Sequence, residues 1–109
     1  MKYLVNTTAG PGFTTAEQTV QVLEMTILPG LEALIGLEAT GKILAGGVPV
    51  GDRSFVFIVE APDNEAVDEL LRSLPIWGVV NWQVTPLQSF AGRAAIERKA
   101  AGAIKADKA

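Results

Sequence analysis

The sequence contains no cysteine and no histidine. The chain therefore has no disulfide, no thiol nucleophile and no imidazole base, and it lacks the commonest protein ligands of zinc and other transition metals. We expect no metal site. Without imidazole, the candidate bases for a proton shift next to a carbonyl are carboxylates, whose affinity for a proton rises when they are buried.

Charge is also scarce, since charged residues make up only 19% of the 109 residues whereas 49% are apolar. A chain of this length buries one modest core, and this composition supplies more core-forming side chains than an average domain. Some of the apolar surface is therefore expected to face a partner. The net charge of -3 gives no electrostatic reason to bind nucleic acid or an anionic membrane surface, and we expect neither partner.

Long uninterrupted apolar runs are missing as well. The most apolar long window, residues 20–37, contains Glu24, Pro29 and Glu32, which argues against a membrane span. The apolar stretch at the N-terminus is too short for the core of a secretory signal. We therefore expect a cytoplasmic protein.

What is present predicts alternating strands and helices. Residues 2–8, 43–50, 54–59 and 77–85 have the composition of strands, and Pro86 is expected to stop the last one. Two segments show apolar residues at spacings of three and four, typical of amphipathic helices: residues 14–40, begun by Thr14 or Thr15, and residues 63–74, begun by Asp63. We expect either a kink at Pro29-Gly30 or two helices end to end there, and a turn at Gly10-Pro11-Gly12.

This order predicts an α+β domain of the ferredoxin-like βαββαβ type, with a four-stranded antiparallel sheet, over residues 1–88. Residues 89–109 form an extra C-terminal helical extension. From Arg93 to Lys108 this extension has five basic residues against Glu97 and Asp107, so it is positive on a negative body. It is either a solvated helix or an arm that docks on an acidic neighbouring subunit.

The segment at residues 54–59 is apolar at nearly every position. Phe55, Phe57 and Val59 should point to one face of the sheet, and Val56 and Ile58 to the other. In the ferredoxin-like fold both helices cover one face, so the second apolar set needs another cover. A second copy of the same sheet is the simplest one, and it predicts a homodimer with a barrel-like core.

Two segments carry a resemblance to a known family. Residues 70–77 (LLRSLPIW) and 82–87 (WQVTPL) resemble the muconolactone isomerase family within the dimeric α+β barrel proteins. The resemblance implies a homo-oligomer that shifts a double bond within a lactone by moving a proton, without metal or organic cofactor. Where that family commonly continues with His-Pro after the last strand, this chain has Ser89-Phe90.

Candidate site residues follow from the need for a base and for groups that orient a small organic molecule. Glu38 is the candidate catalytic base, because it follows Leu31, Leu34 and Ile35 at helical spacing. Arg53 is a candidate partner for a substrate carboxylate, or a hairpin residue paired with Asp52 or with solvent. The other candidate substrate-binding residues are Asn6, Asn81, Gln83, Trp82 and Tyr3.

Each of these residues also has a structural interpretation. Glu38 can be a solvated residue of the last helical turn. The polar side chains can be solvent-exposed residues at an edge of the sheet, and the aromatic ones can pack in the core or at an interface. The sequence therefore predicts a small-molecule enzyme of the isomerase or the cofactor-free monooxygenase type, or alternatively a non-catalytic ligand-binding or assembly subunit.

Overall fold

The computed structural model describes residues 1–10 and 12–108. Its four strands are β1 (Lys2–Ala9), β2 (Ile43–Gly47), β3 (Val56–Glu60) and β4 (Val80–Leu87), and they form one antiparallel sheet in the order β2-β3-β1-β4. This is the predicted ferredoxin-like α+β fold. The turn expected at Gly10-Pro11-Gly12 includes Pro11, which lies outside the described residues.

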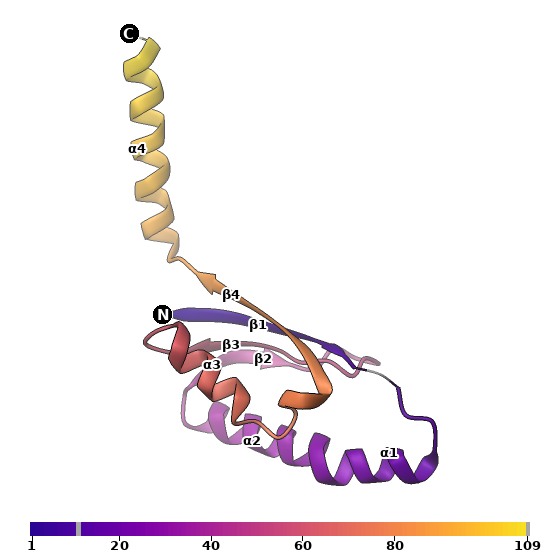
Figure 1. The fold of residues 1–109 in the computed structure, drawn as a ribbon. Helices are drawn as coiled ribbons and strands as arrows, with labels where there is room; N and C mark the ends of the chain where they lie inside the picture. The colour runs from indigo at the N-terminus through magenta and orange to yellow at the C-terminus, as the bar shows by residue number, and fades with distance from the viewer. Residues whose placement is uncertain (11, 109) are drawn as a thin grey trace.

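The helices cover one face of this sheet (Figure 1). They are α1 (Ala16–Val22), a π-helical turn η1 (Leu23–Ile27), α2 (Leu28–Ala39) and α3 (Asn64–Arg72). A short 3-10 turn, η2 (Trp77–Val79), precedes β4. The predicted extra helix is α4 (Phe90–Lys108), and it projects away from the rest of the chain.

Strand register places the two apolar sets of β3 as predicted. Val5 lies between Phe57 and Val84, and all three belong to the helix-covered face. On the other side of the sheet, Leu4 lies opposite Ile58. We call this second side the open face; it carries Leu4, Asn6, Thr8, Val56, Ile58, Asn81, Gln83 and Thr85. Since no helix covers it, its apolar residues are only half-buried.

The first helical segment runs through Pro29 instead of breaking there. The N-cap is Thr15, whose hydroxyl accepts a hydrogen bond from the Gln18 backbone N–H at 3.1 Å. The backbone N–H of Leu28 bonds to the carbonyl of Leu23, five residues back, which is the π-helical pattern. Proline has no N–H and crowds the turn before it, and the wider turn lies directly before Pro29. The expected irregularity therefore sits one turn earlier, in η1.

Several strand and helix ends differ from the prediction. Strand β2 ends at Gly47 instead of residue 50, and β4 begins at Val80, after η2, instead of at Trp77. Pro86 does not stop the last strand; it lies inside β4, opposite Tyr3. Because β4 is an edge strand, it needs its backbone donors on one side only, and such a strand accommodates proline. Helix α3 begins as predicted, with the Asp63 carboxylate accepting from the Ala66 N–H at 2.8 Å, but it ends at Arg72.

The helical stretch Ala16–Ala39 is long and apolar enough, by length and composition, to cross a membrane. In this fold Ile27 and Gly30 are buried against the core, while most of the stretch faces outward. The absence of a membrane partner stays a prediction from the sequence.

Candidate functional site

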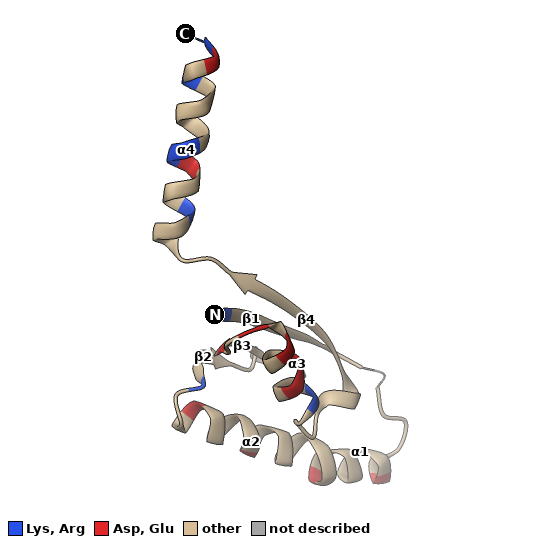
Figure 2. Cartoon of the chain, turned by 60° about the vertical axis from the view of Figure 1, so that its left-hand side comes forward, with Lys and Arg blue, Asp and Glu red and all other residues tan. Residues whose placement is uncertain are grey.

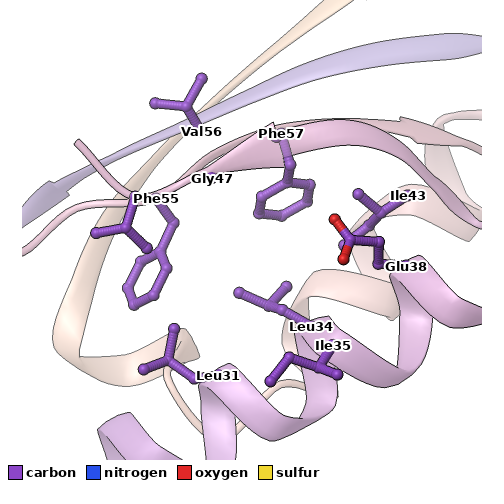
Figure 3. Close-up of a pocket in the computed structure, with 11 residues that line it drawn as sticks. Leu31, Leu34, Ile35, Glu38, Ile43, Gly47, Phe55, Val56 and Phe57 are labelled. Carbon is purple, nitrogen blue, oxygen red and sulfur yellow. The ribbon is translucent and has the colours of Figure 1, made fainter. Parts of the chain in front are cut away.

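A half-open pocket of about 140 Å³ lies between α2 and the β2–β3 hairpin (Figure 3). Helix α2 contributes one wall and the aromatic side chains of Phe55 and Phe57 contribute the other. The lining is apolar or glycine at every position except Glu38. The residues that line it are Leu31, Leu34, Ile35, Glu38, Ile43, Gly46, Gly47, Val48, Phe55, Val56 and Phe57.

The local backbone of β2 forms the edge of this pocket. The register of β2 on β3 shifts between Ile43 and Ala45, which is a β-bulge, and Gly46 follows with a φ of 155°. A Cβ atom on Gly46 would lie 2.5 Å from the Cβ of Phe57, so only glycine allows β2 to approach β3 this closely. Gly47 has open space beside it, which keeps the mouth of the pocket clear.

Glu38 is the one ionisable side chain among the pocket residues. Figure 3 shows its carboxylate turned toward the pocket, on the side of Ile43 and Phe57. The carboxylate is exposed to solvent at the mouth. A carboxylate in this position can contact a ligand that fills the pocket. The arrangement is therefore suited to a general base that acts on an apolar ligand.

Arg53 lines a second cavity of about 250 Å³, further along the same helix–sheet cleft. Its guanidinium group lies 4.7 Å from the centre of the Phe13 ring, a stacked cation–π arrangement. The two cavities are neighbours, because Ile27 of the second lies one turn before Leu31 of the first. Arg53 also lies two residues before Phe55. Asp52, the alternative partner of Arg53, accepts a hydrogen bond from the Ser54 hydroxyl at 3.0 Å.

Tyr3 and Trp82 lie on the helix-covered face but outside the Glu38 pocket. Tyr3 is 1% exposed, and its hydroxyl donates to Asn64 Oδ1 at 2.9 Å. Burial raises the pKa of the Tyr3 phenol above its ordinary value, and the carboxylates of Asp63 and Glu65 raise it further. The indole N–H of Trp82 donates to the Trp77 carbonyl at 3.0 Å. Both aromatic residues thus have the structural positions of core anchors.

Asn6, Asn81 and Gln83 lie on the open face of the sheet. Asn6 is directly opposite Gln83, and Asn81 is opposite Thr8, so these amides form one polar cluster. The sheet separates this cluster from Glu38, whose pocket lies on the helix side. The predicted site residues are therefore divided among the pocket, the second cavity, the core and the open face.

The walls of the pocket were not identified from the sequence as site residues. Phe55 and Phe57 have the pattern of ordinary core residues, and burial alone does not distinguish a core side chain from one that lines a cavity. The signal that was available is the Gly46-Gly47 pair inside a strand, which marks a bulge or a close approach of two backbones. Among the described residues, no three Asp or Glu side chains gather closely enough to hold a metal ion.

Comparisons with known proteins agree with this fold. The family model described as muconolactone delta-isomerase matches residues 1–92. A crystal structure of muconolactone isomerase is similar, with a TM-score of 0.65 and 19% identity, over 82% of this chain and 90% of that one. A 5-chloro-2-hydroxyhydroquinone dehydrochlorinase from Burkholderia phenoliruptrix AC1100, in complex with 2,5-dihydroxybenzoquinone, is also similar. Its TM-score is 0.63 at 20% identity, over 84% of this chain and 98% of that one. No curated protein matches the sequence significantly.

Proposed function

The chain belongs to the muconolactone delta-isomerase family, and from this premise we propose that it is a small-molecule enzyme that moves a proton within a lactone or a related small cyclic organic acid. The observation that carries the proposal is an apolar pocket with a single carboxylate at its mouth. A cofactor-free proton shift next to a carbonyl needs one base and a site that excludes water.

The size of the pocket supports a substrate with one ring. Its volume of about 140 Å³ is close to that of an engineered apolar cavity of about 150 Å³ that binds benzene. The two similar structures are named for ring compounds of this size, a lactone in one and a hydroquinone in the other. A single five- or six-membered ring is therefore the proposed substrate class.

In the proposed reaction the substrate has a carbon–carbon double bond conjugated with its carbonyl, and the Glu38 carboxylate takes a proton from the carbon just beyond that double bond. The electrons of the broken C–H bond move through the double bond to the carbonyl oxygen and form a dienolate. The protonated Glu38 then returns the proton to the carbon next to the carbonyl, as the double bond shifts and the carbonyl re-forms. The reaction consumes nothing else. Arg53, in the neighbouring cavity, pairs with a carboxylate on the substrate.

A Glu38→Gln variant tests the role of the base. This change keeps the shape of the side chain but removes the proton acceptor, so turnover should fall by about 10² to 10⁴ while the ligand still binds. Incubation with muconolactone and ultraviolet detection of double-bond migration measures the rate. Glu69→Gln on α3, an exposed residue outside the pocket, is the matched control and should leave the rate unchanged. Equal rates for Glu38→Gln and the wild-type chain would remove Glu38 from the mechanism.

The second candidate function is a non-catalytic ligand-binding subunit. The pocket lining contains only one ionisable residue, and therefore no acid–base pair, which favours this alternative. A thermal-shift screen with small aromatic and lactone acids separates these functions, because a bound ligand stabilises the fold. Stabilisation without turnover supports the binding subunit. Neither stabilisation nor turnover supports a subunit used only for assembly.

A further inference from the structure

Helix α4 is unpacked along its whole length. None of its side chains is buried, and both views show it leading away from the sheet and the other helices (Figures 1 and 2). The radius of gyration is 19.0 Å, whereas a compact domain of this length has a value of about 13 Å. The family match ends at residue 92, so nearly all of α4 lies beyond it. The family match therefore does not account for a helix at this position that packs against nothing in its own chain.

Helix α4 nevertheless carries large apolar side chains. Phe90, Ile96 and Ile104 are 97%, 52% and 59% exposed. At about 100° per residue, these three and Ala100 fall within an arc of about 120° on the helix. The same arc also holds Asp107, Lys108 and the ion-paired Arg93 and Glu97. Arg98 and Lys105 flank one edge of this arc, and Lys99 flanks the other. Over its length α4 has five basic and two acidic residues, a net charge of +3.

The outer face of the α1–η1–α2 segment has the complementary pattern. Val20, Leu28 and Ile35 are 52%, 51% and 64% exposed, and the exposed carboxylates of Glu24 and Glu32 lie between them. Spacings of four, four, four and three residues place all five on one side of the helix. We call this row the acidic stripe. Residues 16–39 contain four carboxylates and no basic residue, as Figure 2 shows along α1 and α2.

The two surfaces also match in length. Phe90 to Ile104 spans about 21 Å of helix and Val20 to Ile35 about 22 Å. Both rows present large apolar side chains with charges beside or between them. These charges are acidic on the stripe and basic on balance on α4, which also carries Glu97 and Asp107. Contact would bury apolar surface on both helices and bring opposite charges together at its edges.

The acidic stripe is out of reach of α4 in the same chain. Only Gln88 and Ser89 connect β4 to α4, and two residues span at most about 7 Å. The stripe is on the far side of the helix layer from the sheet, and that layer alone is about 10 Å thick. A lipid surface fits poorly, because Glu24 and Glu32 lie in the middle of the apolar row and would oppose anionic headgroups.

We propose that α4 of one copy docks along the acidic stripe of a second copy of this chain. The apolar side chains Phe90, Ile96 and Ile104 pack on Val20, Leu28 and Ile35. The Arg98 and Lys105 side chains pair with Glu24 and Glu32. Since every copy has both surfaces, exchange of arms across a two-fold axis makes the contact twice. The basic arm thereby offsets the excess negative charge of the body.

Two charge-reversal variants of the full-length chain, one in α4 and one in the acidic stripe, test this contact. R98E/K105E should weaken self-association about tenfold or more, because attraction at two exposed pairs becomes repulsion in each of two contacts. E24K/E32K should weaken it similarly. An equimolar mixture should associate as the wild-type chain does, since every arm then meets a stripe of opposite sign. E65K/E69K on α3 changes the net charge equally and should have no effect. Sedimentation velocity at several concentrations measures the association.

Hydrogen exchange of the α4 backbone distinguishes this contact from other modes of pairing. Protection of residues 90–108 should rise with protein concentration in the wild-type chain and in the mixture, and not in either variant alone. Fast exchange at every concentration would overturn the proposal, as would a mixture that does not recover. Protection that appears only with anionic lipid vesicles or with nucleic acid would also overturn it, since the arm would then serve a different partner.

Discussion

Tyr3 and Glu38 are two ionisable site candidates from the sequence, Tyr3 for substrate binding and Glu38 as the catalytic base, and their positions in the fold separate them. The Tyr3 phenol is buried under the helices and bonded to Asn64, whereas the Glu38 carboxylate is at the mouth of a pocket. Burial favours the neutral form of the phenol. Tyr3 therefore contributes to the pH dependence of stability, and Glu38 is left as the candidate base.

The free energy of unfolding should fall above about pH 10 because of Tyr3. The folded chain holds the phenol proton to a higher pH than the unfolded chain, whose tyrosine keeps the ordinary value of 10.0. The contribution of Tyr3 is thus complete below pH 10 and is lost as the pH rises through the folded pKa. Since Tyr3 is the single tyrosine, phenolate absorbance at high pH reports on it alone.

Denaturant titrations at several pH values, compared with those of a Tyr3→Phe variant, measure this contribution. The wild-type chain should lose more stability than the variant between pH 9 and about pH 11. Parallel curves for the two proteins would show that the phenol titrates alike in the folded and unfolded states, contrary to the prediction.

At the scale of elements, the packing of α2 depends on one glycine. A Cβ atom on Gly30 would lie 2.2 Å from Cγ2 of Ile76, a fully buried residue. Gly36, two turns later in the same helix, has no atom within 4 Å of such a Cβ. Both glycines lie inside α2, so the sequence alone does not distinguish them. Only their tertiary contacts do.

Gly30→Ala should destabilise the fold by about 1–3 kcal/mol, because the added methyl group forces Ile76 and α2 apart. Gly36→Ala should instead stabilise it by about 0.5–1 kcal/mol, since alanine loses less backbone entropy in a helix. Urea unfolding of both variants measures the difference. Equal effects at the two positions would contradict the close contact between α2 and Ile76.

Much of the secondary structure is predictable from the sequence, because it depends on residues that are close together in the chain. The Asp63 cap, the helical spacing before and after Pro29 and the two-sided apolar pattern of residues 54–59 need only neighbouring residues. The continuation of the last strand through Pro86 was mispredicted, because it depends on β4 being an edge strand. The pocket walls were missed for a similar reason: a cavity is the space that two elements leave between them.

At the scale of the whole molecule, the open face carries Leu4, Val56 and Ile58 without a covering helix. The prediction that a second sheet covers it rests on this apolar cluster. The polar cluster of Asn6, Asn81 and Gln83 lies beside it on the same face. Paired sheets would therefore bury an apolar centre with hydrogen-bonding groups next to it.

An Ile58→Lys variant should shift the chain from dimer toward monomer, because the lysine places a charge in the centre of the paired faces. Val50→Lys, in the fully exposed loop after β2, makes the same kind of change away from the open face and should leave the dimer intact. Light scattering at micromolar concentration measures the mass. A wild-type chain that is monomeric at this concentration would overturn the prediction of pairing.

The amino-acid sequence by itself determined the order of strands and helices, the two-sided apolar strand and the exclusion of thiol and imidazole chemistry, because composition and short-range periodicity are properties of neighbouring residues. It also supplied Glu38 as a candidate base. Only the tertiary structure decided which candidates share a cavity, since strand register and helix packing join residues far apart in the chain. It separated Asn6, Asn81 and Gln83 from Glu38 and left α4 without a contact surface in its own chain.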